Sequence, residues 1–192
     1  MLSKLVEPHG GDGLKVLLAP QAKRVRVLDR ARSLIQVPMT SREVSDVLMM
    51  AMGAYTPLGG FMGEADWHGT CVEMRLSSGV FWPIPITLSC DKVLADGIQL
   101  SEEVALVDDD SGEILAVMEI TEKYKPDIDL ECEHVYRTAD RAHPGVKKVL
   151  EQGQINLAGR ISCLSEGEYP GNYPELYIRP AQARAMFMDN GW

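Results

Sequence analysis

The sequence predicts an α+β chain whose helices and strands occupy successive stretches. Apolar residues recur at helical spacing in residues 21–34 and again after Thr40, which indicates helices near the amino terminus. A proline-marked apolar run at 82–90, and two β-like runs separated by an acidic turn at 108–112, indicate strands in the middle of the chain. Helical patterns return beyond Pro126. We therefore expect a β-rich core with peripheral helices.

The composition is that of a globular chain and argues against two classes of function. Of 192 residues, 45% are hydrophobic and 24% are charged, which is enough apolar material for a substantial core. The formal net charge of -9 opposes non-specific nucleic-acid binding, which requires Lys and Arg to neutralise phosphates. The sequence has neither a membrane-spanning apolar run nor a signal-peptide pattern. We expect a cytoplasmic protein with reduced thiols and no membrane partner.

A first helix is predicted over residues 21–34. Val25 and Ala31 lie on its expected inner face. The Lys and Arg residues between core positions are interpreted as a solvated face rather than an anion-binding cluster. Residues 35–37 should form a short strand that Pro38 stops, because proline has no backbone N–H to donate.

A second helix should begin at a capping box formed by Thr40 and Glu43, and should end at Gly53 as a left-handed cap. Three methionines lie near its end: Met49, Met50 and Met52. They predict an adaptable packing surface rather than a metal site, because no Cys or His adjoins them.

Residues 53–62, the glycine-rich connection, follow this helix. Gly59, Gly60 and Pro57 permit a sharp bend, and the apolar side chains around them indicate burial. The connection carries no Lys, Arg, His or acid, so we interpret it as a buried link rather than a ligand loop.

The middle of the chain predicts a third helix at 64–74 and a strand at 82–90. Pro83 and Pro85 remove two amide donors from the same side of that strand, so it should be an edge strand or one that closes a barrel.

A turn at Asp96 and Gly97 leads to a predicted hairpin, with strands at 104–107 and 113–124. The acidic turn between them, 108–112, lacks the ligand spacing of a calcium loop, and no Glu closes it.

Residues 127–135 and 143–152 predict helices, and residues 155–161 predict a strand. Cys132, His134 and His143 are the local candidates for a metal site. Their spacing is not that of a known helical chelate, so structural roles are favoured.

Glycines at Gly10, Gly11 and Gly13 invite comparison with a phosphate-binding loop. No Gly-Lys-Ser/Thr sequence closes the motif and no strand precedes it, so a simple turn is favoured.

The carboxyl-terminal part predicts a polar loop at 166–177 and a helix at 179–191. The apolar stripe of this helix needs a packing partner that no later residue supplies. We expect an amino-terminal domain over residues 1–170, followed by a linker and the first helix of a second, missing domain over residues 171–192.

Several runs together resemble the amino-terminal part of the ATP sulfurylase (sulfate adenylyltransferase) family, of the type found in sulfur-metabolising prokaryotes. The matching runs are 5–11, 57–62, 74–76, 82–86, Thr138 with Asp140, 143–146, and 179–184 leading to 191–192. Their order and spacing cover nearly the whole chain.

The resemblance implies a PUA-like β-barrel with peripheral helices, followed in the family by an α/β nucleotidyltransferase domain. It implies that the whole enzyme converts MgATP and sulfate to adenosine 5'-phosphosulfate and pyrophosphate, reversibly. The family's active-site run of Gln, Arg, Asn, Pro and His follows the position of Trp192. We therefore assign no catalytic, substrate-binding, cofactor-binding or metal residue to this chain, and we expect it to be structural and inactive alone.

The resemblance also sets the expected partners: ATP, sulfate and the missing catalytic domain, with self-association left open and nucleic acid not expected. The alternative is a free-standing PUA-like module that binds RNA or protein, because PUA-like domains bind RNA elsewhere. The acidic charge disfavours RNA.

Overall fold

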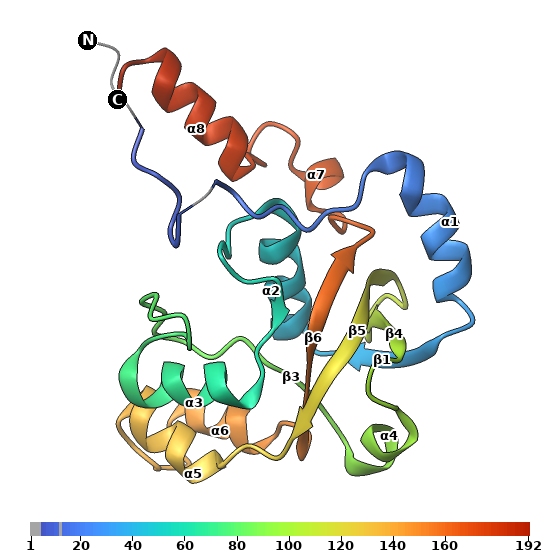
Figure 1. The fold of residues 1–192 in the computed structure, drawn as a ribbon, viewed down its shortest axis with the longest axis vertical. Helices are drawn as coiled ribbons and strands as arrows, with labels where there is room; N and C mark the ends of the chain where they lie inside the picture. The colour runs from blue at the N-terminus through green and yellow to red at the C-terminus, as the bar shows by residue number, and fades with distance from the viewer. Residues whose placement is uncertain (1–4, 12) are drawn as a thin grey trace. The chain divides into compact units, whose positions relative to one another are not determined.

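The computed structural model describes residues 5–11 and 13–192 (Figure 1). The chain divides into two compact units. The first unit comprises the described part of Met1–Gly60 together with Ala105–Met118 and Ile161–Trp192. The second comprises Phe61–Val104 and Glu119–Arg160. The chain therefore passes between the units several times, and the long strands contribute residues to both.

The strands of the described residues pair in one sheet. Their bounds are β1 Ile35–Met39, β2 Gly60–Phe61, β3 Leu88–Cys90, β4 Glu103–Asp108, β5 Ile114–Tyr124 and β6 Ile155–Cys163. The pairing order is β1-β4-β5-β6-β2, and β3 pairs antiparallel with β6 so that Leu88 lies opposite Leu157. A sheet with surrounding helices is confirmed. The expected barrel is not confirmed, because the pairing path runs from β1 to β2 without closing.

Helices α1 Gln21–Ala31 and α2 Ser41–Met52 belong to the first unit, as do α7 Tyr169–Asn172 and α8 Pro180–Asp189. The capping box of α2 is confirmed, since the Glu43 carboxylate accepts hydrogen bonds from the backbone N–H and the hydroxyl of Thr40 at 2.9 and 2.7 Å. Gly53 ends α2 with φ of 84°, as the sequence predicts. One part of the core joins α1 to the sheet through Ala31, Ala105, Val107, Val117 and Leu164.

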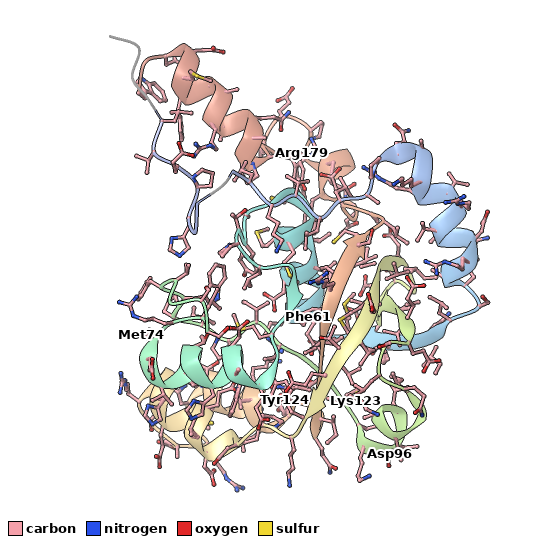
Figure 2. All side chains as sticks on the ribbon, viewed as in Figure 1. Phe61, Met74, Asp96, Lys123, Tyr124 and Arg179 are labelled. Carbon is pink, nitrogen blue, oxygen red and sulfur yellow. The ribbon has the colours of Figure 1, made fainter. Side chains whose placement is uncertain are left out.

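The second unit holds α3 Glu64–Glu73, α4 Lys92–Gly97, α5 Ile128–Glu131, the π-helix η1 Cys132–Tyr136 and α6 Pro144–Leu150. Asp91 caps α4 by accepting from the Leu94 N–H at 2.7 Å. The Lys123 ammonium donates to the carbonyl oxygens of Ala95 and Ile98 at 2.8 and 2.6 Å, which satisfies acceptors at the carboxyl-terminal end of α4 (Figure 2).

Four local predictions are wrong. Pro38 lies inside β1, which tolerates it because β1 is an edge strand of the sheet. Residues 82–87 are not a strand, since Pro83 and Pro85 cannot donate to a ladder and pairing begins only at Leu88.

Asp96 and Gly97 lie in α4 rather than in a turn. The predicted polar loop at 166–177 contains a helical turn, α7.

Val25, which was expected on the inner face of its helix, and Met74 are both exposed. Val25 on α1 is 70% exposed, and α1 contacts the core through Leu28 and Ala31 instead. Met74 lies at the left-handed carboxyl-terminal end of α3 and also faces solvent (Figure 2).

Candidate functional site

Two of the three metal candidates, Cys132 and His143, take structural roles in the second unit, and His134 is half-buried on η1. Cys132 is buried in a small core with Val146 and Val149, and burial raises the pKa of its thiol. His143 caps α6, because its Nδ1 accepts from the backbone N–H groups of Gly145 and Val146 at 3.2 and 3.4 Å. Within residues 5–11 and 13–192, no three His, Cys, Asp or Glu side chains are grouped closely enough to hold a metal ion.

The glycine turn near the amino terminus packs against the glycine-rich connection. The Gly11 N–H donates to the Pro8 carbonyl at 2.9 Å, and a Cβ placed on Gly10 would lie 2.8 Å from the Pro57 ring. Asp12 lies outside the described residues. This packing supports the prediction of a simple turn.

The described cysteines are all buried, which disfavours a role as catalytic nucleophiles. Burial raises the pKa of Cys71, with a smaller contribution from Glu131, and of Cys163, each to about 12. Such thiols stay protonated at neutral pH and are poor nucleophiles.

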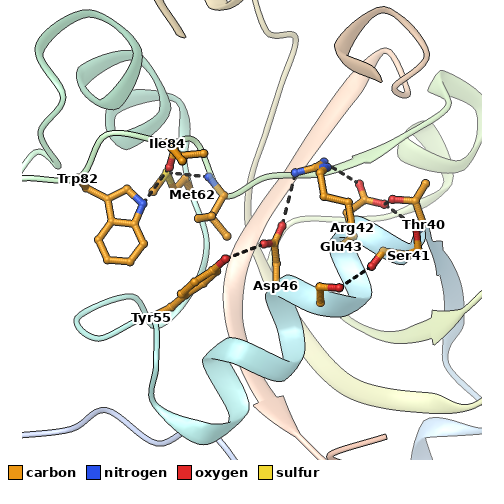
Figure 3. A network of polar contacts seen from close by, with 11 residues as sticks. Thr40, Ser41, Arg42, Glu43, Asp46, Tyr55, Met62, Trp82 and Ile84 are labelled. Carbon is orange, nitrogen blue, oxygen red and sulfur yellow. Dashed lines mark hydrogen bonds and ion pairs between the residues drawn. The ribbon is translucent and has the colours of Figure 1, made fainter. Parts of the chain in front are cut away.

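A polar cluster on α2 contains a carboxyl group, that of Asp46, whose pKa is clearly shifted (Figure 3). Asp46 is buried and accepts from the Tyr55 hydroxyl at 3.2 Å and from Arg42 at 3.4 Å. Arg42 also pairs with Glu43 at 3.5 Å. Burial raises the pKa of Asp46 from 3.8 to about 6, although Arg42 and the Tyr55 hydrogen bond oppose the shift.

The contacts of this cluster hold the glycine-rich connection against α2. Asp46 lies on α2, and Tyr55 lies in the glycine-rich connection that follows. Burial and the neighbouring Asp46 charge raise the pKa of Tyr55 to about 12, so the phenol remains a hydrogen-bond donor at neutral pH. The pair therefore fixes the direction in which the chain leaves α2.

A second structural feature of the first unit is a pocket of about 290 Å³ between α2 and residues 169–177, which we call the tyrosine–methionine pocket. Its lining residues include Leu48, Met49, Met52, Tyr169, Tyr173 and Leu176. Among the described residues that line it, none is charged. It lacks the cations that a phosphate or sulfate group requires, and its volume is at the lower limit for ligand pockets.

An ion pair fixes the segment that forms one wall of this pocket. Arg179 donates to both oxygens of the Glu166 carboxylate at 2.6 and 2.7 Å, and the Tyr177 hydroxyl donates to the same carboxylate at 3.4 Å (Figure 2). The Arg179 hydrogen bonds hold the pKa of Glu166 below its usual range. The two-point geometry orients the chain where it enters α8.

Residues 169–192 present an unusual amount of apolar surface. Eight large hydrophobic residues of this stretch are exposed, namely Tyr169, Tyr173, Leu176, Ile178, Met186, Phe187, Met188 and Trp192. No residue of α8 is buried, and the helix is tied to the amino-terminal segment by a hydrogen bond from Arg184 to the Val6 carbonyl at 2.8 Å. A helix with this composition normally buries one face.

The PUA-like domain family matches residues 6–166 of this chain. Sulfate adenylyltransferase of Syntrophobacter fumaroxidans is 51% identical over 193 aligned positions, which cover 100% of this chain and 47% of the relative. The sulfate adenylyltransferase of Chlorobaculum tepidum is 49% identical over 189 positions, covering 98% of this chain and 47% of that protein. The resemblance found in the sequence is confirmed, and the chain spans about half the length of the curated relatives it matches.

Among solved structures, the chain is similar to one described as a hexameric APS kinase from Thiobacillus denitrificans. The TM-score is 0.72 at 30% identity, and the match covers 98% of this chain and 32% of that one. In the part of the chain that the structure describes, no helix is both long and apolar enough to span a lipid bilayer.

Proposed function

We propose that this chain, which belongs to the PUA-like domain family, acts as the amino-terminal half of a sulfate adenylyltransferase. The observation that carries the proposal is the identity of about half of all residues, across the entire chain, to curated proteins of that name. The conclusion rests on the whole length of the match rather than on one motif.

The reaction of the whole protein would convert MgATP and sulfate to adenosine 5'-phosphosulfate and pyrophosphate, reversibly. A sulfate oxygen attacks the α-phosphorus, and the bond to pyrophosphate breaks. The charge that develops on the phosphoryl oxygens requires cationic groups placed in advance. The proposal assigns those groups, and the binding of MgATP, to the other half of the protein and to no residue of this chain.

The proposed role of this chain is to support that second half. Residues 1–170 would form the PUA-like domain, and residues 171–192 would form the linker and the first helix of the catalytic domain. Two observations support this boundary: α8 buries none of its residues, and exposed apolar side chains gather in the same stretch. A helix of this kind gains most of its stability from packing, which a following domain would supply.

A cytoplasmic location and self-association complete the proposal. Self-association is supported by the similarity of nearly the whole chain to a protein described as hexameric. ATP and sulfate are proposed as ligands of the whole protein, on the basis of the names of the relatives.

The test compares this chain alone with a chimera in which it replaces the matching half of the Syntrophobacter fumaroxidans relative. Both are incubated with MgATP and sulfate in the presence of pyrophosphatase, and adenosine 5'-phosphosulfate is measured. We expect formation by the chimera and none by the isolated chain. Turnover by the isolated chain would overturn the assignment of the chemistry to the other half, and a folded but inactive chimera would overturn the proposed role.

The alternative of a free-standing RNA-binding module is favoured by one observation, the match to the PUA-like family. The net charge of -9 opposes it, because phosphate neutralisation would have to come from a local basic patch. We expect no binding of single- or double-stranded RNA at micromolar chain concentrations. Micromolar binding that weakens with added salt would favour this alternative instead.

A further inference from the structure

The tyrosine–methionine pocket continues into a surface that its own unit leaves open to solvent. Leu176 is 79% exposed and Tyr173 is 54% exposed, although both line the pocket. A large aliphatic side chain in that position exposes apolar area worth about 2 kcal/mol when it is buried. The pocket and its rim therefore form one apolar surface rather than an enclosed cavity.

The lining of the pocket indicates what kind of group fits it. The absence of charge among its lining residues disfavours nucleotides and sulfate, and the volume of about 290 Å³ suits one or two apolar side chains. Met49 and Met52 provide an unbranched, polarisable floor that adapts to the shape of an incoming side chain. Tyrosines around such a floor are typical of protein contact surfaces.

The position of the pocket favours the downstream half of the same polypeptide as its occupant over a second copy of this chain. One wall is the segment that the Arg179–Glu166 ion pair fixes immediately before α8. Helix α8 has 10 residues, so chain that continues past it would start roughly 15 Å from this wall. About five extended residues span that distance. A covalently attached partner docks at a high effective concentration, whereas a second copy must also lose its translational freedom.

We propose that the tyrosine–methionine pocket is the docking site for apolar side chains of the downstream half of the protein. This inference rests on the proposed function, because it requires a protein as long as the relatives. This chain covers 47% of the Syntrophobacter fumaroxidans relative. Docking there would bury Leu176 and Tyr173 and would complete the packing of residues 169–178.

The buried native cysteines allow a direct test by thiol labelling. The four cysteines of the chain are all buried, so Leu176→Cys introduces a single accessible thiol into the isolated chain. The labelling rate with a maleimide is measured in the isolated chain and in the chimera, with the background of the unsubstituted chimera subtracted. We expect labelling of Leu176→Cys to be at least about tenfold slower in the chimera, which corresponds to about 1.4 kcal/mol of protection.

Val25→Cys serves as the matched control, because Val25 is exposed on α1 of the same unit and does not line the pocket. Its labelling rate should be the same in both proteins. Equal rates for Leu176→Cys in the two proteins, or equal slowing of both variants, would overturn the proposal. Slow labelling of Leu176→Cys in the isolated chain that depends on chain concentration would also overturn it, because a second copy would then be the occupant.

The labelling result is distinguishable from a failure of the proposed function. If the chimera forms no adenosine 5'-phosphosulfate but still protects Leu176→Cys, the assigned activity fails and the docking site stands. If the chimera is active and Leu176→Cys is not protected, the activity stands and the docking site fails.

Discussion

The buried carboxylate of Asp46 accepts a hydrogen bond from the hydroxyl of Tyr55 at 3.2 Å, which joins α2 to the glycine-rich connection (Figure 3). Arg42 contacts the other carboxylate oxygen at 3.4 Å. Burial outweighs both contacts, and the pKa of Asp46 rises to about 6. The buried acid should therefore make the free energy of unfolding depend on pH, and this dependence can be measured.

We predict that Asp46→Asn removes a loss of stability between pH 4 and pH 6. The pKa of Asp46 is higher in the folded state than the unperturbed value of 3.8, so the folded state binds this proton more tightly than the unfolded state does. Protonation of Asp46 therefore stabilises the fold in full below pH 4, and that stabilisation is lost as the pH rises through about 6. Across this window the stability of Asp46→Asn relative to the natural chain should rise by about 3 kcal/mol. Urea denaturation at half-unit pH intervals measures the difference.

Tyr55→Phe provides the companion measurement. The Tyr55 hydrogen bond lowers the pKa of Asp46 in the folded state, so its removal should extend the upper end of the window to higher pH, while the lower end, set by the unfolded chain, stays in place. A difference between the natural chain and Asp46→Asn that stays constant from pH 4 to pH 7 would contradict the assignment of this titration to Asp46.

The second prediction concerns the ion pair of Glu166 and Arg179. Arg179→Gln should lower the free energy of unfolding by about 1 kcal/mol at pH 7, because it removes both charge-assisted hydrogen bonds. The pKa of Glu166 is lowered in the folded state, so this contribution is present above the unfolded pKa and lost as the pH falls through the folded value. The effect of the substitution should therefore shrink as the pH falls below 4.5, the unperturbed pKa of a glutamate.

Arg32→Gln is the control for this pair. Arg32 contacts Asp29 at 3.5 Å, with both side chains largely exposed, so its removal should change the free energy of unfolding by less than about 0.5 kcal/mol. Equal effects of the two substitutions in urea denaturation would argue against a special contribution from the two-point geometry of Arg179.

Local signals in the sequence predicted the elements whose ends depend on neighbouring residues. Thr40 and Glu43 marked the start of α2, and Gly53 marked its end, because capping depends on residues three or four positions apart. The hairpin of β4 and β5 was predicted for the same reason, since its turn residues lie between two β-like runs.

Features that depend on distant segments were not predictable in this way. The tyrosine–methionine pocket joins residues 45–52 to residues 169–177, and no period or motif links those stretches. The methionines predicted a packing surface, and Met49 and Met52 do line the pocket, but Met50 lies in the core. The partner of Asp46 was also not apparent, because the turn that brings Tyr55 back to α2 depends on the path of the connection. The boundary at residue 170 remains a prediction.

The last prediction concerns the close approach of Gly153 to Cys90. A Cβ on Gly153 would lie far inside van der Waals contact of the backbone carbonyl carbon and oxygen of Cys90. The Gly153 N–H donates to the Ser89 hydroxyl at 3.1 Å, and the ladder of β3 and β6 starts beside it with Cys90 opposite Ile155. Backbone cannot rotate away as a side chain can, so the turn at Gly153 and the end of β3 would have to separate.

Gly153→Ala should therefore lower the free energy of unfolding by about 3 kcal/mol, at the upper end of the cost of overpacking. Gly171→Ala is the matched control, because a Cβ at Gly171 meets no atom within 4 Å. That substitution should leave stability unchanged or raise it by up to about 1 kcal/mol through the lower entropy of the unfolded chain. Urea denaturation followed by circular dichroism compares the two. Coinciding midpoints for Gly153→Ala and the natural chain would show that β3 does not pack against this turn as closely as the geometry requires.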